Sequence, residues 1–351
     1  DEFAVLVESM YRPDEAVMIA ERILSVFRHP FVIDGREIHV GTSIGIAVSS
    51  PVALASEDLL RNADLAMYLA KSQGKGKHIV FEAKMHEALM ERIELEEELR
   101  RGIEQREFVI HYQPILDLTT NKMVGMEALV RWMHPRLGLL APMKFIPMAE
   151  ETNLIVPLGE WILGEACRQV QAWRVKHLGK LDVAVTVNIS IRQFVQAQLV
   201  ELVSRALENS GLPPNSLILE ITESFMMQDT ESTIEKLHEL KKLGVRLAID
   251  DFGTGYSSLS YLQRFPIDIL KIDKSFIDKL GQGSEGNAVA KAIIMMGDSL
   301  NLKTIAEGIE HPEQISELQL LGCEAGQGFH FAKPLTVGDM DEFLRARQRS
   351  E

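Results

Sequence analysis

The chain has 351 residues, a length that predicts roughly two domains. Its 51 acidic residues against 37 Lys and Arg give a formal net charge of −14, which argues against a nucleic-acid polymer or an anionic membrane surface as the partner. The cysteines, Cys167 and Cys323, have no CxxC spacing, so the sequence supports neither a disulfide framework nor a cysteine zinc site, and it favours a cytoplasmic location.

No run of about 20 apolar residues predicts a membrane span, and no signal peptide opens the sequence. The first residues, Asp1-Glu2-Phe3, lack an initiator Met and run directly into an apolar stretch. We therefore expect a fragment of a longer protein. We predict no membrane contact by this fragment, while the sequence leaves room for a membrane anchor upstream.

Residues 1–82 alternate short predicted strands and helices. An Asp34-Gly35 pair between two apolar runs indicates a hairpin. A later helix should bury Leu60, Ala63, Met67 and Ala70. The predicted elements of this α+β module are a strand at Phe3–Val7, a helix at Asp14–Phe27, hairpin strands at Phe31–Ile33 and Ile38–Val40, a strand at Thr42–Ala47 and a helix at Glu57–Lys71.

Several short motifs in this module are those of a known family: Asp1-Glu2-Phe3, the run Gly41–Ala47, and Leu60-Arg61-Asn62-Ala63-Asp64 followed by Ala66-Met67-Tyr68 and Ala70-Lys71. On these residues the module resembles the C-terminal part of a GGDEF (diguanylate cyclase) domain. The glycine pair of the family motif, the first metal-binding strand end and part of the nucleotide pocket are absent from this sequence. Lys75 stands where the family usually has Arg. We therefore expect no conversion of GTP by this chain.

Residues 83–105 are dense in Glu and Arg and carry apolar residues spaced by four: Met85, Leu89, Ile93, Leu95, Leu99 and Ile103. This spacing predicts a helix with one buried face. Such a helix would serve as a connector between domains, as a surface helix of the second domain, or as both. The predicted boundaries are 1–82 for the first domain, 83–94 for the connector and 95–346 for the second domain.

From Glu107 onward, strand-like apolar runs alternate with amphipathic stretches. The alternation predicts an α/β fold with a TIM-like (β/α)8 barrel, and an open doubly wound sheet is the alternative. No GxGxxG or Walker loop follows a strand, which disfavours a nucleotide-binding open sheet. The predicted strands are Phe108–Ile115, Val124–Val130, Val183–Ile189, Ser216–Ile221, Val245–Ile249, Ile269–Ile272, Lys303–Ala306 and Ala325–Phe331, and the predicted helices are Glu160–Trp173, Gln193–Asn209, Thr230–Leu243, Ala288–Leu300 and Pro312–Leu320.

Polar residues stand at the carboxyl ends of these predicted strands. The stretch LAIDDFGTGYSSL ends a strand on Asp250 and Asp251, which by itself is also the pattern of a solvated strand end followed by a turn. The carboxyl ends of barrel strands meet at one rim, so we expect these side chains to converge. The other members are Glu127, Asn188, Glu220, Glu223, Lys271, Asp273, Glu307, Glu310 and Gln327.

A converging set of carboxylates requires a cation. Each like-charge pair at about 4 Å costs on the order of 4 kcal/mol at an effective dielectric constant near 20. The ligands are all oxygens, which favours Mg²⁺ or Mn²⁺, and more acids than one ion can use predict two ions suited to phosphoryl chemistry. Lys271 should stay charged, either to assist that chemistry or as a counter-ion within the barrel.

The second domain also carries an ordered series of family motifs. They are Tyr112-Gln113-Pro114, Glu127-Ala128-Leu129-Val130-Arg131-Trp132, His134-Pro135 with Phe145-Ile146-Pro147 and Ala149-Glu150, Asn188, Glu220-Ile221-Thr222-Glu223, the Leu247–Leu259 stretch, Lys271-Ile272-Asp273, Glu307-Gly308-Ile309-Glu310 and Gln327-Gly328-Phe329 with Lys333-Pro334. On these motifs the domain resembles an EAL domain, the cyclic di-GMP phosphodiesterase family. Phe329 and Asn153 are small departures from the family pattern.

The resemblance implies a role for each matched residue. One metal ion would be held by Glu127, Asn188, Glu220 and Asp250, and the second by Asp251 with Glu307 as ligand or general base, Lys271 standing beside the attacking water. Substrate would be held by Gln113, Leu129 and Arg131, with Gln327 as a supporting contact. Glu223 would steady the loop Phe252–Leu259, which also links the site to dimer contacts.

The implied function is hydrolysis of one phosphodiester of cyclic di-GMP to linear pGpG in bacterial signalling, by a homodimer formed through the EAL domain. The alternative is a catalytically silent cyclic di-GMP receptor, as in EAL domains that have lost metal ligands. The complete set of expected ligands favours the enzyme. A purely structural dimerisation domain would leave the converging acids unexplained.

Overall fold

The computed structural model describes residues 3–8, 12, 14–27, 30–33, 36–38, 40–49, 56–72, 76–177, 183–223, 230–253, 262–281 and 284–350. The chain forms two compact units, Asp1–Glu98 and Leu99–Glu351. Each is described by itself.

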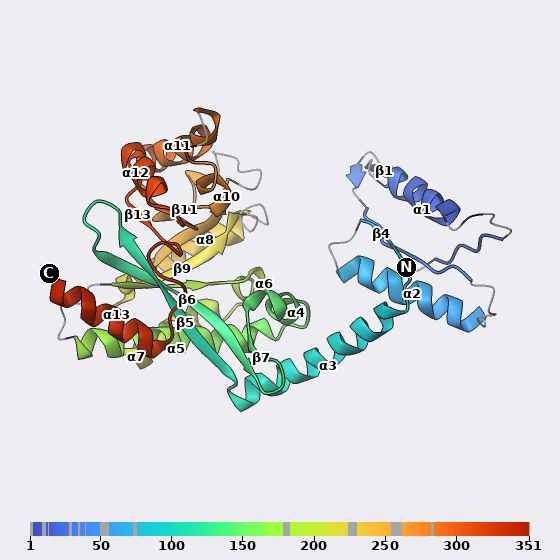
Figure 1. Ribbon diagram of the computed structural model, residues 1–351, viewed down its shortest axis with the longest axis horizontal. Helices are drawn as coiled ribbons and strands as arrows, with labels where there is room; N and C mark the ends of the chain where they lie inside the picture. The colour runs from blue at the N-terminus through green and yellow to red at the C-terminus, as the bar shows by residue number, and fades with distance from the viewer. Residues whose placement is uncertain are drawn as a thin grey trace. The chain divides into compact units, whose positions relative to one another are not determined.

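The described residues of the first unit form two short pairs of strands, two complete helices and the first part of a third (Figure 1). Strands β1 and β2 form the predicted antiparallel hairpin, and β3 and β4 pair in parallel. Helix α2 packs so closely on β3 that a Cβ on Gly45 would lie 1.9 Å from the Ala63 carbonyl oxygen. The bounds are α1 Asp14–Val26, β1 Phe31–Ile33, β2 Arg36–Ile38, β3 Ile44–Ile46, α2 Ser56–Ser72 and β4 His78–Val80.

One prediction for this unit is wrong, and another is correct only in part. The segment Phe3–Val7 is not a strand, because no described strand pairs with it. The predicted buried face of α2 is correct at Ala70, which is buried, and wrong at Leu60, which is 60% exposed. Leu65 and Ala66, which were not predicted, are also buried. Gly45 of β3 lies against the backbone of Ala63 and Met67, so β3 covers part of the predicted face.

Helix α3, Lys84–Gln105, runs without interruption through the predicted connector. Its last turns belong to the second unit, where Leu99 is fully buried and Gly102 lies against Trp132 and Glu107. The Trp132 indole Nε1 donates a hydrogen bond to Glu107 Oε2 at 2.9 Å beside that glycine. The predicted apolar face is correct at Leu99, but Ile93 is 44% exposed.

The second unit is the predicted barrel. Eight strands close in the order β5-β6-β8-β9-β10-β11-β12-β13, with β13 returning to β5, and β7 extends the edge of β6. Helices surround the strands in Figure 1. The bounds are β5 Phe108–Asp117, β6 Met123–His134, β7 Gly138–Leu140, β8 Ala184–Asn188, β9 Leu217–Thr222, β10 Arg246–Phe252, β11 Ile269–Ile272, β12 Lys303–Ala306 and β13 Ala325–Gly326.

One strand departs from an all-parallel barrel. Strand β5 is antiparallel to both β6 and β13. Only residues 118–122 join β5 to β6, and a connection of five residues is too short for the crossover that parallel neighbours need. Strand β13 is also shorter than predicted, because the chain leaves the sheet after Gly326.

The helices follow the predicted alternation with local differences. The stretch predicted as one helix over Gln193–Asn209 forms two, α6 and α7, and α13 was not predicted. The bounds are η1 Pro142–Lys144, α4 Ile146–Glu151, α5 Ile155–Lys176, α6 Ile191–Phe194, α7 Leu199–Ser210, η2 Pro214–Ser216, α8 Thr230–Lys242, α10 Lys274–Ile277, α11 Ser284–Ser299, α12 Pro312–Leu321 and α13 Val337–Ser350.

The barrel interior begins with an apolar layer. Seven strands each contribute one buried side chain to it: Ile115, Ala184, Ile218, Ala248, Ile269, Ile305 and Ala325. The ring combines four isoleucines with three alanines, so side chains of different size fill the interior of the barrel. We call this layer the apolar floor, because the polar side chains of the next layer lie directly above it.

Candidate active site

The polar side chains at the carboxyl ends of the strands form the next layer of the barrel. Side chains two residues apart on a strand point to the same face. Stepping two residues toward the rim from six of the seven apolar positions therefore gives the inward-facing set Gln113, Glu220, Asp250, Lys271, Glu307 and Gln327. The same step from Ala184 gives the buried Thr186. The apolar floor and the polar site are thus consecutive layers produced by one strand periodicity.

Lys271 lies at the centre of this layer. Its side chain is 1% exposed, and its ammonium Nζ contacts Glu220 Oε1 and Glu307 Oε1 directly. The distances from Nζ to Asp250 Oδ1 and Glu127 Oε2 are 3.2 and 3.8 Å. Four carboxylates therefore surround one ammonium, which leaves an excess of negative charge inside the barrel when all of them are ionised.

Amide side chains fix the Glu127 carboxylate. Asn188 Nδ2 donates to Glu127 Oε1 at 2.8 Å, and Gln327 Nε2 donates to Glu127 Oε2 at 2.6 Å. Gln327 Nε2 also donates to Gln113 Oε1 at 2.9 Å, while Gln113 Nε2 donates to the Ala332 carbonyl at 3.0 Å. Gln113 is therefore held at both ends of its amide, which orients Gln327 and through it Glu127.

The electrostatics of the layer follow from burial and crowding. Burial raises the pKa of Glu220 well above its usual value, and Asp250, Glu127 and Glu307 raise it further against the lowering effect of Lys271. Burial likewise raises the pKa of Glu307 to about 8. Burial alone would lower the pKa of Lys271, but the surrounding carboxylates raise it well above its usual value, so the lysine stays charged.

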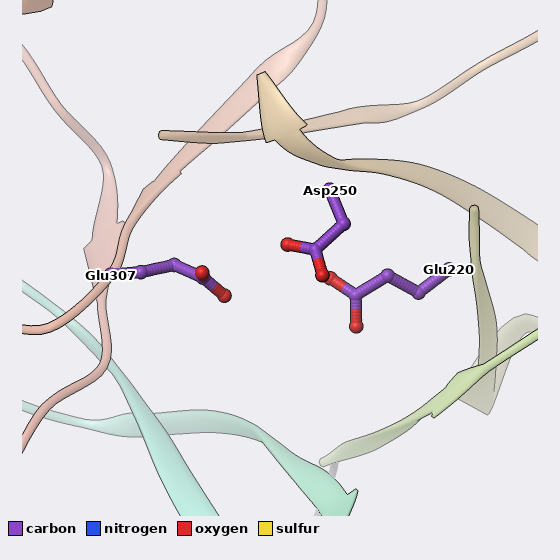
Figure 2. A group of neighbouring side chains, drawn as sticks. All are labelled: Glu220, Asp250 and Glu307. Carbon is purple, nitrogen blue, oxygen red and sulfur yellow. The ribbon is translucent and has the colours of Figure 1, made fainter. Parts of the chain in front are cut away.

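Oxygen atoms from Glu220, Asp250 and Glu307 point toward one another in Figure 2, and one oxygen of each lies within 4.8 Å of those of the other two. Glu220 Oε2 is buried and accepts no hydrogen bond from any described residue. An all-oxygen donor set with an unused buried oxygen and excess negative charge fits a hard divalent cation such as Mg²⁺ or Mn²⁺.

The chain turns sharply where the two adjacent aspartates stand. Asp251 has a φ of +54° and Gly253 a φ of +99°, and the pairing of β10 with β11 shifts register between Ile249 and Phe252. Asp250 therefore faces inward, while Asp251 is exposed and lies outside the group of three carboxylates. Burial and the neighbouring Asp250 raise the pKa of Asp251.

Glu223 contacts the start of the following loop. Its side chain is buried, and its Oε2 accepts a hydrogen bond from the Gly253 backbone N–H at 2.8 Å. Of the loop Phe252–Leu259, only Phe252 and Gly253 are among the described residues. The anchoring bond is therefore observed at the first turn of the loop.

A cleft of about 280 Å³ opens above the polar layer. Seven predicted site residues line it: Gln113, Glu127, Leu129, Asp250, Lys271, Glu307 and Gln327. Asn188, Glu220, Glu223, Arg131 and Asp251 do not line it, and the Arg131 guanidinium Nη1 donates to the Val130 carbonyl at 2.8 Å.

Several lining residues were not assigned to the site from the sequence. They are Lys274, Gly308, Glu310, Gly328 and Phe329. Glu310 was noted only as a strand-end acid. Lys274 carried no signal of its own, because a lysine after a strand is usually a solvated charge.

The fold and the cleft define a closed α/β barrel with an acidic, cation-compatible site at the carboxyl ends of its strands. Residues 96–334 match the EAL domain, and the chain belongs to the EAL domain family. Residues 1–77 match the diguanylate cyclase, GGDEF domain, so the EAL domain follows a GGDEF fragment.

Two relatives from Pseudomonas aeruginosa illustrate the similarity. The bifunctional diguanylate cyclase/cyclic di-GMP phosphodiesterase MucR is 43% identical over 95% of this chain and 48% of its own length. The cyclic di-GMP phosphodiesterase NbdA is 39% identical over 99% of this chain and 44% of its own length. The chain thus spans about half the length of these curated relatives.

Solved structures of EAL proteins are also similar to this chain. The PaMucR phosphodiesterase in complex with c-di-GMP is 45% identical and covers 70% of this chain and 99% of its own, with a TM-score of 0.68. The EAL enzyme Bd1971 bound to cAMP and cyclic-di-GMP is 33% identical and covers 83% of this chain and 76% of its own, with a TM-score of 0.70. Among the described residues, no helix combines the length and apolar character needed to cross a membrane.

Proposed function

We propose that this chain is a cyclic di-GMP phosphodiesterase that cleaves one phosphodiester bond to give linear pGpG. The observation that carries the proposal is the buried layer in which Glu127, Glu220, Asp250 and Glu307 surround Lys271 at the base of an open cleft. The relatives named as phosphodiesterases support the same substrate.

Two divalent cations, Mg²⁺ or Mn²⁺, complete the proposed site. Glu127, Asn188, Glu220 and Asp250 would hold one ion, and Asp251 with Glu307 the other. When bound, such ions lower the pKa of water and neutralise the charge of the phosphodiester. The fit of the first ion rests on the crowded oxygens of Glu220 and Asp250.

The chain's own residues would perform the remaining steps. Glu307, whose carboxylate lines the cleft beside the Lys271 ammonium, would accept the proton of the attacking water in its alternative role as general base. The Lys271 ammonium is positioned to stabilise negative charge that develops on the phosphoryl oxygens. Leu129 would contact the substrate in the cleft, and Arg131 would bind a phosphate oxygen after leaving the Val130 carbonyl.

Gln113 and Gln327 are proposed substrate contacts with a second duty. Their amides already form the chain of hydrogen bonds that orients Glu127. We therefore assign them to positioning Glu127 as well as to lining the cleft. Glu223 would hold the loop after Asp251 through the Gly253 N–H.

The deciding measurement is pGpG formation from cyclic di-GMP with Mg²⁺ or Mn²⁺. The wild-type chain should turn over, and Glu127→Ala should lose at least about a hundredfold in rate, because it removes both a ligand and a partner of Lys271. Glu313→Ala, an exposed acid on α12, is the matched control. Tight binding by the wild type without product would instead identify a receptor.

We further propose a cytoplasmic homodimer that forms through the EAL domain. Both cysteines are buried free thiols, which suits a reducing compartment. Sedimentation of the chain and of residues 83–351 tests the dimer. A monomer in both cases would contradict it, and a dimer of the full chain alone would place the contact outside the EAL domain.

A further inference from the structure

The carboxyl end of helix α3 is joined to strand β6 through one residue, Glu107. The Glu107 backbone N–H donates to the Gly102 carbonyl at 2.9 Å, and the Glu107 carbonyl accepts from the Met133 N–H at 2.8 Å. The Glu107 carboxylate Oε2 accepts a hydrogen bond from the Trp132 indole Nε1 at 2.9 Å. Glu107 is therefore bonded to the last turn of the helix and to two consecutive residues of the strand.

The Trp132 side chain is enclosed on several sides. It is fully buried, its ring stacks on Phe108 with centroids 5.4 Å apart, and it meets Phe145 edge-on at 5.8 Å. A Cβ on Gly102 would lie 2.9 Å from the indole Nε1 and 2.8 Å from Glu107 Oε2. The backbone of α3 thus lies directly on the hydrogen bond between the indole and the carboxylate.

Arg131 immediately precedes the two residues that Glu107 holds. Side chains alternate along a strand, so Arg131 faces away from Trp132 and to the same side as Leu129, which lines the cleft. The Arg131 side chain is half-buried, and its Nη1 donates to the Val130 carbonyl at 2.8 Å. To bind a phosphate, this side chain has to turn while its backbone stays in place. The contacts of Glu107 on the other face of β6 provide that fixed point.

We propose that Glu107 is a positioning residue for substrate binding, which fixes β6 at Trp132 and Met133 so that Arg131 can reach a phosphate oxygen. This inference deepens the proposed function and rests on it through the role of Arg131. Glu107 does not line the cleft, so it acts through Arg131 and not on the substrate itself. Because bonds from a guanidinium to phosphate depend on alignment, a small shift of the β6 backbone should weaken them.

Two substitutions of Glu107 separate the hydrogen bond from the rest of the side chain. Glu107→Leu removes the acceptor and leaves a buried indole N–H unpaired, whereas Glu107→Gln keeps an oxygen that can accept the same bond. Isothermal titration of the full chain with cyclic di-GMP, with Ca²⁺ in place of Mg²⁺, measures the Kd. We expect Glu107→Leu to raise the Kd about three- to tenfold and Glu107→Gln to stay within about twofold of the wild type.

Gly102→Ala tests the same contact from the helix, because its Cβ would displace the Glu107 carboxylate or the indole. It should raise the Kd by a similar factor. Gly164→Ala is the matched control on helix α5, since a Cβ there meets nothing within 4 Å, and it should leave the Kd unchanged. With Mg²⁺, Glu107→Leu and Gly102→Ala should raise KM and keep kcat within about twofold, because the carboxylates around Lys271 are untouched.

A double-mutant cycle distinguishes positioning from a general loss of packing. Arg131→Ala alone should raise the Kd about tenfold. If Glu107 acts through Arg131, then adding Glu107→Leu to Arg131→Ala should raise the Kd by less than about twofold more. Urea denaturation verifies that each variant is folded at the temperature of the titration. If Glu107→Leu does not fold, Gly102→Ala takes its place in the cycle.

Equal losses of affinity from Glu107→Leu in the wild-type and Arg131→Ala backgrounds would overturn the inference, as would an unchanged Kd in Glu107→Leu. Formation of pGpG by the wild type is measured in parallel. A loss that depends on Arg131 in a chain that makes no pGpG would support positioning and refute only the hydrolysis. Product formation without that dependence would do the reverse, and a wild type that does not bind cyclic di-GMP would overturn both.

Discussion

At the scale of single residues, the chemistry of the barrel depends on the balance between the positive charge of Lys271 and the negative charges of the carboxylates around it. The lysine is almost completely buried, and its charge is retained because the carboxylates around it outweigh the cost of burial. A divalent cation would pair with the same carboxylates as Lys271. The ammonium of Lys271 therefore neutralises the carboxylates alone when no cation is bound, and together with the cation when one is bound.

Replacing Lys271 by Met should destabilise the cation-free protein. It leaves buried carboxylates without their counter-charge, at a cost of about 3 kcal/mol in the free energy of unfolding. Urea denaturation in EDTA measures the loss. Mn²⁺ should then raise the denaturation midpoint of the variant more than that of the wild type. An unchanged midpoint in EDTA would show that the lysine does not hold the layer together.

Replacing Glu223 by Ala should lower turnover of cyclic di-GMP more than its distance from the acid cluster suggests. The change removes the acceptor for the Gly253 N–H, directly after Asp251. We expect kcat to fall about tenfold or more, with little change in the denaturation midpoint. Glu235→Ala, on α8, is a control that leaves this contact in place. Unaltered steady-state kinetics would argue against an anchoring role.

At the scale of elements, the hydrophobic periodicity of the sequence was a good guide to the barrel. It located all eight barrel strands. It did not predict features that depend on loop length or on tertiary packing. The antiparallel course of β5 depends on the length of one loop, and the division of α6 from α7 depends on tertiary packing. The Phe3–Val7 run has the composition of a strand, but no described strand pairs with it.

The same distinction applies to the site. The strand-end residues Glu220, Asp250, Lys271 and Glu307 could be predicted to converge, because their strands are neighbours in a barrel. The sequence did not show that Gln113 is held at both ends of its amide, or that Asp251 is turned out of the inner group. Those facts depend on backbone turns and on contacts between residues more than 200 positions apart.

Helices α5 and α13 are joined by charged contacts around Asp341. The carboxylate pairs with Lys176 at 2.8 Å, with His177 at 3.2 Å and with Arg345 at 2.7 Å. Burial raises the pKa of Asp341, but these partners outweigh it and lower the pKa below the usual value of 3.8. The ionised carboxylate is therefore the form that stabilises the fold.

Asp341→Asn should lower the free energy of unfolding by about 1 to 2 kcal/mol at pH 7. Because the pKa of this acid is lowered in the folded state, its contribution is present above pH 3.8 and is lost as the pH falls through the lower folded-state pKa. Denaturant titrations of both proteins from pH 7 downward should show the gap closing below pH 4. A gap that stays constant would assign the effect to packing.

At the scale of the whole molecule, the EAL barrel has its own core and should fold without the GGDEF fragment. The last turns of α3 belong to that core, since Leu99 is fully buried and Gly102 lies against Trp132. The proposed boundary at residue 95 therefore falls inside a helix that continues on both sides. A truncation that leaves helix α3 complete should preserve the fold of the barrel.

Residues 84–351 should unfold with the same midpoint as the barrel in the full chain and hydrolyse cyclic di-GMP. Residues 107–351 lack the end of α3, and the loss of Leu99 alone should cost about 1.5 to 3 kcal/mol. Thermal denaturation and product formation by the two fragments test this. Equal stability of both would show that α3 is dispensable to the barrel.

The two consecutive layers inside the barrel also constrain how the family can vary. Six of the strands carry a residue of the apolar floor and a site residue two positions apart, so a one-residue insertion or deletion within such a strand would turn its polar side chain outward and its next apolar residue into the site. Loops and helices can lengthen freely, whereas strand lengths cannot. We expect sequence drift in this domain to be recorded in substitutions along the strands and in length changes everywhere else.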